Sequence, residues 1–209
     1  MLERDLGRAL KRRLADDEND KLDLIRRRSP KDGAEVVVGD LALHREGFVD
    51  AVRDQLRAAG LAGTQFAAEV LSDQDQEPAA VDSVGIDDLA AELAESLVDP
   101  IRAKTVELLD GSEGDDALDG VRACYRQWKG RAGELAAQYV HTAFNRGVFA
   151  AVPEGTMVSW VVDDGADPCP DGEDDALGGA VVRGEGFPTG HLHPPAHPAC
   201  RCLLVPGVL

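Results

Sequence analysis

Apolar residues recur at helical spacing over much of the chain. The apolar residues of 48–56 return every four positions and mark one face of a helix, which Asp40 can cap at its start. Gly60 and Gly63 predict the end of this helix, because glycine is a poor helix former. A short helix over 64–71 is expected after them.

Two further amphipathic segments follow a break in the pattern. Residues 72–84 are polar, have no period and predict a loop. Apolar residues over 86–101 then predict a helix with a kink or a fresh start at Pro100, since proline removes one helical hydrogen bond. A long apolar stripe over 115–151 predicts another helix. We therefore expect an elongated helical region over 41–151.

The last part of the chain has a different period. Residues 156–162 are rich in β-branched side chains and alternate, which predicts a strand, and 181–183 and 203–205 are shorter strand candidates. Glycine, proline and aspartate dominate the segments between them. The predicted fold class is therefore α+β, with a small domain of strands and loops over 152–209 after the helical part.

The first 40 residues carry more charge than the helical region. Ten Lys/Arg alternate there with ten Asp/Glu. We expect a charged, flexible arm over 1–40 with a short helix at 2–14. Its arginines are candidates for contact with DNA phosphates or an acidic partner; the alternative is a solvated tail whose charges cancel. The candidates are Arg12, Arg13, Arg26, Arg27 and Arg28.

Composition limits the classes of partner. The formal net charge is -17, and an acidic body argues against a broad nucleic-acid-binding face. Few of the basic residues are lysines, a composition typical of proteins from salt-loving organisms, although a GC-rich genome with ordinary solubility charge gives the same pattern. No apolar run approaches the roughly 20 residues that span a bilayer. We expect no membrane partner and synthesis in the host cytoplasm.

Cysteine and histidine gather near the C-terminus. Cys169, His197, Cys200 and Cys202 have the side chains that tetrahedral zinc prefers, and a loop-rich sheet with little core gains stability from such a clamp. Alternatives for the fourth ligand are Asp171, His191 and His193. A disulfide between Cys169 and Cys200 or Cys202, or a set of free buried thiols, fits the same residues.

A catalytic use of this cluster requires more than ligands. A metal-dependent nuclease or hydrolase needs an open coordination position and a general base, and His191, His193 and His197 are the candidates for those roles. The prolines around these histidines make the segment stiff, which suits a structural site equally well. Structural and catalytic interpretations both remain at this stage.

The order of motifs in the last third of the chain resembles a known family. Ala143-Phe144-Asn145-Arg146-Gly147 closes a helix, Trp160 and Cys169-Pro170 follow, and the chain then reaches Pro194-Pro195-Ala196-His197-Pro198-Ala199-Cys200-Arg201-Cys202. Over about residues 133–206 this order resembles the C-terminal domain of the Mu F-like minor head proteins, also called phage head morphogenesis proteins. Many members carry Cys-x-x-Cys where this chain has Cys169-Pro-Asp-Gly172.

The resemblance implies a structural function rather than an enzymatic one. It implies a minor head protein in the capsid of a tailed virus, inside the virion head at the portal vertex, acting in head morphogenesis, genome packaging or early DNA delivery. The implied partners are the portal protein and, beyond it, the major capsid protein and packaged DNA. The acidic composition then indicates a host that lives at high salt. A toxin-associated delivery module is a third interpretation.

Overall fold

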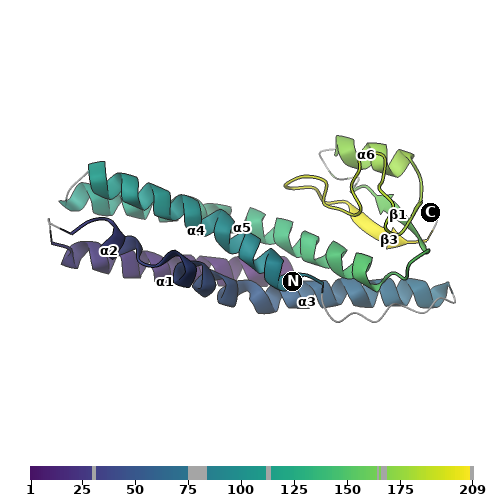
Figure 1. The fold of residues 1–209 in the computed structure, drawn as a ribbon, viewed down its shortest axis with the longest axis horizontal. Coiled ribbons are helices and arrows are strands. Elements are labelled where there is room, and N and C mark those ends of the chain that lie inside the picture. Colours follow the sequence, from purple (N-terminus) through teal and green to yellow (C-terminus); the bar gives the residue numbers. More distant parts are fainter. Residues whose placement is uncertain (30–31, 75–83, 112–113, 164, 166–168, 208–209) are drawn as a thin grey trace. The chain divides into compact units, whose positions relative to one another are not determined.

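The computed structural model describes residues 1–29, 32–74, 84–111, 114–163, 165 and 169–207 (Figure 1). Long helices come first and a small sheet with one short helix comes last, so the predicted α+β class is confirmed. No helix among these residues combines the length and apolar character needed to cross a bilayer. The helices are α1 (Leu2–Arg27), α2 (Glu35–Val38), α3 (Leu41–Asp73), α4 (Ile86–Gly111), α5 (Gly114–Ala151) and α6 (Pro170–Leu177). The strands are β1 (Met157–Val161), β2 (Val181–Val182) and β3 (Leu203–Pro206).

The chain forms two compact units whose limits fall inside helices. The first unit comprises Glu3–Asp54 and Asp87–Ala136, and the second comprises Gln55–Ile86 and Ala137–Leu209. α3 and α5 therefore each contribute to both units. These limits fall within helices, whereas the boundaries predicted from the sequence lie at 40 and 151.

The first unit contains, as a long helix with one buried face, most of the segment that was expected to be a flexible arm. α1 is continuous from Leu2 to Arg27, well beyond the short helix expected at 2–14. Leu6, Leu10 and Leu14 lie one helical turn apart and are fully buried, and Leu22 extends the same face. Burying a leucine side chain stabilises by about 1.5–3 kcal/mol. This stripe is enough to fix the segment despite its high charge.

The helix that was expected to end at Gly60 and Gly63 continues to Asp73. In the second unit these glycines face α5. A Cβ at Gly63 would collide with the carbonyl oxygen of Phe144, and a Cβ at Gly147 would collide with the carbonyl oxygen of Gly60. The glycines thus allow two helix backbones to touch, and this contact outweighs their poor helix propensity.

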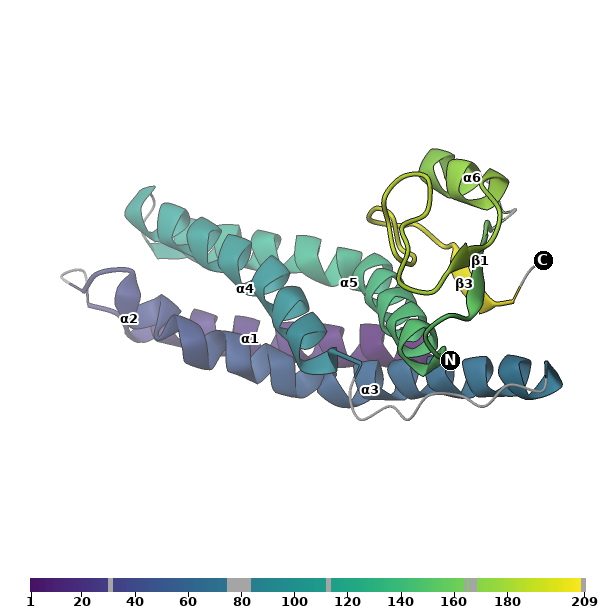
Figure 2. The ribbon, with the colours of Figure 1, turned by 45° about the vertical axis from the view of Figure 1, so that its right-hand side comes forward.

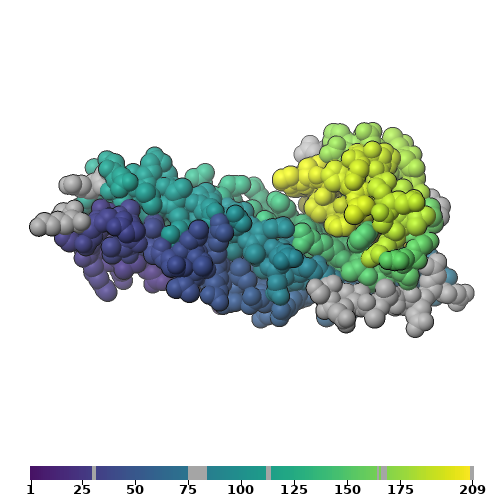
Figure 3. Space-filling model, in the orientation of Figure 1, coloured from purple at the N-terminus to yellow at the C-terminus, as the bar shows by residue number. Residues whose placement is uncertain are grey.

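The second unit contains a three-stranded antiparallel sheet in the order β2-β1-β3. The three predicted strands are confirmed; Trp160 on β1 pairs with Leu204 on β3. Trp160 also meets Phe187 edge to face at 5.2 Å between ring centroids, and its neighbours in the core include Cys169, Cys200 and Cys202. α6 packs against β1 (Figure 2). The residues that connect β2 to β3 pack closely together (Figure 3).

Candidate metal centre

Three cysteines from two loops meet in the core of the second unit. Cys169 is the N-cap residue of α6, and Cys200 and Cys202 lie just before β3. Their sulfur atoms all lie within 4.8 Å of one another, and none of the three residues is more than 8% exposed. No ion pair or disulfide links them; all three are free thiols. This group can hold a metal ion.

The separation of the sulfurs fits tetrahedral coordination of one metal ion. Two thiolates bound to one zinc ion lie about 3.8 Å apart, because each Zn–S bond is about 2.3 Å long. The sulfurs of Cys169 and Cys200 are 3.9 Å apart. A disulfide bond is about 2.05 Å long, so the same pair would have to close by nearly 2 Å to form one.

His197 is the nitrogen donor nearest to this group. Its Nε2 lies 2.9 Å from the sulfur of Cys169, and its Nδ1 lies 2.8 Å from the carbonyl oxygen of Pro198. A carbonyl can only accept, so Nδ1 carries the proton and donates it. In the neutral ring Nε2 then keeps its lone pair and directs it at the sulfur group. A proton held on Nδ1 by a backbone carbonyl is the usual state of a histidine that binds zinc through Nε2.

Two N–H groups support the sulfurs. The backbone N–H of Gly172 donates to the sulfur of Cys169 over 3.2 Å. The indole N–H of Trp160 is buried without a well-aligned acceptor and faces Cys202, and its interaction lowers the pKa of that thiol. Burial nevertheless raises the pKa of Cys202 to about 12, with a contribution from the neighbouring thiols. Without a metal the thiol therefore keeps its proton at neutral pH, and a bound metal would have to displace it.

Gly172 explains how this chain departs from the Cys-x-x-Cys pattern. A Cβ at this position would lie 2.6 Å from the sulfur of Cys202 and 3.1 Å from that of Cys169. The backbone at residue 172 therefore has no room for a side chain unless the sulfurs move. Residue 172 therefore offers no fourth ligand, and the nitrogen that contacts Cys169 is that of His197 on the other loop.

The alternative ligands predicted from the sequence are not members of the sulfur group. Asp171 is half-buried in the first turn of α6. The Nδ1 of His191 is 2.7 Å from the hydroxyl oxygen of Thr189, and the Nδ1 of His193 is 2.7 Å from the carbonyl oxygen of Pro194. Burial lowers the pKa of His193 and favours its neutral form. Both rings are held by local hydrogen bonds.

One buried carboxylate in this unit was not anticipated. Asp175 on α6 is fully buried and accepts hydrogen bonds from the backbone N–H and the hydroxyl of Thr189, over 2.9 and 2.8 Å. These two hydrogen bonds connect the loop that contains His191 to α6. Nothing in the spacing of the acidic residues of α6 distinguishes Asp175 from its exposed neighbours, so sequence reasoning had no signal for it.

The arginines predicted to contact DNA or a partner divide by environment. Arg12, Arg26 and Arg27 are exposed, whereas Arg13 and Arg28 are half-buried. The guanidinium of Arg13 lies 4.9 Å from the centre of the Phe48 ring, and Arg28 donates to the carbonyl oxygen of Asp32 over 2.8 Å. Arg13 and Arg28 thus have intramolecular partners that bind their side chains within the first unit.

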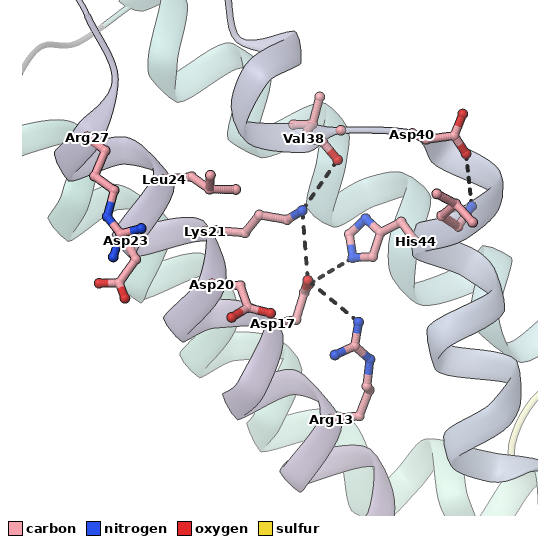
Figure 4. Close-up of a pocket in the computed structure, with 12 residues that line it drawn as sticks. Arg13, Asp17, Asp20, Lys21, Asp23, Leu24, Arg27, Val38, Asp40 and His44 are labelled. Carbon is pink, nitrogen blue, oxygen red and sulfur yellow. Dashed lines mark hydrogen bonds and ion pairs between the residues drawn. The ribbon is translucent and has the colours of Figure 1, made fainter.

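Arg13 belongs to a buried polar cluster around Asp17 (Figure 4). One carboxylate oxygen of Asp17 accepts from the Nε2 of His44 over 2.8 Å and from the hydroxyl of Tyr125 over 2.6 Å. The other oxygen is 3.9 Å from both Arg13 and Lys21. Burial would raise the pKa of Asp17, but the hydrogen bonds from His44 and Tyr125 outweigh it and the pKa is lowered. The cluster joins α1, α3 and α5 beside a hollow of about 590 Å³.

Lys21 completes this cluster. It is only 9% exposed, and its ammonium donates to the carbonyl oxygen of Val38 over 3.3 Å. Burial lowers its pKa, although Asp17 acts in the opposite direction. The contacts of Asp17, His44, Tyr125 and Lys21 thus come from the unit itself, which indicates a structural network.

Comparison of the chain with protein-family models, with curated proteins and with solved structures gives no match.

Proposed function

We propose that this chain is a minor head protein of a tailed virus, bound at the portal vertex inside the head, whose C-terminal part is closed by a structural zinc ion. One observation carries the proposal. Two residues of the closing motif that resembles the Mu F-like family, Cys200 and Cys202, gather with Cys169 in one sulfur group, and His197 of the same motif contacts the sulfur of Cys169. The motif thus has a physical use in this fold.

Zinc is the metal that this donor set favours. Three thiolates and one imidazole match the Cys₃His sets of structural zinc sites, and thiolates select against magnesium and calcium. The 2.9 Å between Nε2 of His197 and the sulfur of Cys169 is that of a hydrogen bond. Two such donors on one zinc ion lie about 3.5 Å apart. The His197 ring is not within 4.8 Å of all three sulfurs, so it would have to move toward Cys200 and Cys202 to bind the same ion.

The same donor set supports a structural role over a hydrolytic one. Four protein donors fill a tetrahedral shell, whereas catalytic zinc keeps a position open for water or substrate. The nuclease or hydrolase alternative would use His191, His193 and His197, yet none of these histidines is a member of the sulfur group. A bound zinc would instead supply cohesion.

The small size of the sheet explains why a bound metal ion would stabilise the second unit. β1, β2 and β3 contain five, two and four residues, and the connections between them are rich in glycine and proline. A sheet of this size buries little apolar area, so a metal that joins two loops contributes a large share of its folding free energy.

The viral role rests on the resemblance over about residues 133–206. The portal protein as principal partner, further contact with the major capsid protein or packaged DNA, and the virion as location all belong to this proposal. A net charge of -17 is consistent with a virus of a high-salt host.

Metal content and thiol count test the zinc site. The chain is purified without chelator, its zinc is measured by mass spectrometry, and its thiols are titrated before and after chelation. About one zinc per chain, with the cluster thiols reacting only after chelation, is the expected result. Absence of zinc with two thiols missing would replace the metal with a disulfide, and absence of zinc with all four cysteines reactive would leave loop packing alone.

Binding to a portal ring tests the viral role separately. A portal protein from the same virus is assembled into rings, and co-sedimentation measures whether the chain binds them. We expect binding to the ring and the presence of this chain in purified particles by mass spectrometry. A chain that binds no ring and is absent from particles would refute the assignment, whatever the zinc content.

A further inference from the structure

Asn145 connects α5 to the loop that carries two of the cluster cysteines. Its side chain is fully buried. Its amide nitrogen donates to the carbonyl oxygen of Cys202 over 3.2 Å, and its amide oxygen accepts from the backbone N–H of Leu204 over 2.8 Å. The same nitrogen also donates to the carbonyl oxygen of His141, one turn back in α5, over 3.1 Å. Each polar atom of the side chain is thus hydrogen-bonded.

These hydrogen bonds fix the backbone of Cys202. A primary amide that binds a carbonyl and an N–H two residues apart makes the pair of contacts that a neighbouring antiparallel strand would make. On its other side this segment pairs with β1, where Leu204 lies opposite Trp160. The residue that follows Cys202 is therefore clamped between a helix side chain and a strand, and the direction of the Cys202 side chain is set by that clamp.

We propose that Asn145 is a positioning residue for the metal site: it holds the thiol of Cys202 within the sulfur group before metal arrives. This inference rests on the proposed zinc site. An amide satisfies these contacts because it offers an acceptor to the N–H of Leu204 and a donor to the carbonyl of Cys202. An aspartate in its place keeps the acceptor but puts a carboxylate against two carbonyl oxygens.

The Asn145→Asp variant separates positioning from simple packing. It preserves shape and the acceptor for Leu204 but loses the donor to Cys202. Loss of a supporting contact around metal ligands usually lowers metal affinity ten- to a hundredfold. We expect that range for zinc, measured by competition with a chromophoric chelator under conditions where circular dichroism shows both proteins folded.

Thr142→Ala is the matched control. Thr142 lies on the same helix, and its hydroxyl donates to the carbonyl oxygen of Gln138 over 3.0 Å, so the variant loses a helix side-chain bond without touching β3. We expect its zinc affinity to stay within about twofold of the parent. Equal zinc affinities for the parent and folded Asn145→Asp would overturn the positioning role.

Two further measurements keep the inference testable. If Asn145→Asp does not fold, Asn145→Ser, which is too short to reach Cys202, takes its place in the same zinc competition. If the parent chain binds no zinc, the zinc proposal fails on its own. The positioning role is then decided by the rate at which the Cys202 thiol reacts with a maleimide: at least a tenfold rise in Asn145→Asp but not in Thr142→Ala supports it, and equal rates overturn it.

Discussion

Replacing Asp17 by alanine tests the polar cluster that joins α1, α3 and α5 in the first unit. The carboxylate is 2% exposed and is bonded to His44 and Tyr125, with Arg13 and Lys21 close by. Its removal would leave a buried hydroxyl, an imidazole N–H and the Lys21 ammonium without their anion. Each loss acts on a group that the fold shields from bulk water.

The expected magnitude follows from these contacts. Breaking a buried ion pair by removing one partner costs about 3–5 kcal/mol, and an orphaned buried donor costs about 1–3 kcal/mol. The hollow beside Lys21 holds about 590 Å³ and admits water to the exposed side of the cluster, which reduces the penalty. We therefore expect Asp17→Ala to lower the free energy of unfolding of the first unit by about 3 kcal/mol.

The assay must report the first unit separately from the second. Urea unfolding followed by circular dichroism gives the total change, and hydrogen exchange of peptides from α1 reports this unit alone. Asp16→Ala is the control, since Asp16 is an exposed acid on the same helix, and it should change stability by less than about 0.5 kcal/mol. If the two variants lose the same small amount, the buried cluster contributes nothing specific and the reasoning is refuted.

Other outcomes follow from the same structure. The Cys200→Ser, Cys202→Ser double variant should lose zinc binding and protease resistance of the second unit while the helices of the first keep their circular dichroism; unchanged protease resistance would contradict the clamp. Gly147→Ala, whose Cβ would strike the backbone of α3, should cost about 1–3 kcal/mol, whereas Gly130→Ala, with open space around it, should be neutral or stabilising by up to about 1 kcal/mol in urea unfolding. The lowered pKa of Asp17 means that its stabilisation is complete above its unfolded value near 3.9 and is lost as pH falls through the folded value; the protection of α1 peptides relative to unfolded-chain exchange at the same pH should therefore fall below about pH 4, and less so in Asp17→Ala.

Sequence reasoning succeeded where residue type and local period carry the information. The strand over Met157–Val161 and the α+β class follow from alternation and helical stripes. The sulfur group follows from ligand chemistry: Cys169 was selected with Cys200 and Cys202 although about 30 residues separate them, because a loop-rich sheet offers few other ways to close. The ligand chemistry of the side chains identified these three cysteines, and the structure shows that their sulfur atoms lie close together.

Sequence reasoning failed where a distant segment decides the outcome. The segment of α1 was predicted to be a charged, flexible arm because basic and acidic residues alternate there, yet Leu6, Leu10 and Leu14 are buried on one face of a helix. Asp17 and Lys21 gain their partners from α3, α5 and the backbone of Val38, which no local pattern reveals. Local propensity describes a residue that is exposed to water, whereas these leucines, Asp17 and Lys21 are buried in the folded protein.

The roles of Asn145 and Gly172 also depend on distant segments. In the sequence alone, Asn145 is a polar residue within a helical stripe and Gly172 is a residue near the start of a helix. In the structure, β3 lies beside Asn145, and two sulfur atoms lie close to where a Cβ of residue 172 would be. For both, the sequence shows the residue but not the neighbour.

The contact between Asn145 and β3 also bears on self-association. β3 lies at one edge of the sheet, and an open edge presents unpaired N–H and C=O groups to which a strand of another chain can add. The amide of Asn145 occupies the N–H of Leu204 and the carbonyl of Cys202 on that edge. The opposite edge, β2, is only two residues long and offers little template. One helix side chain thus occupies two of the backbone groups through which the longer edge could pair with a strand of another chain.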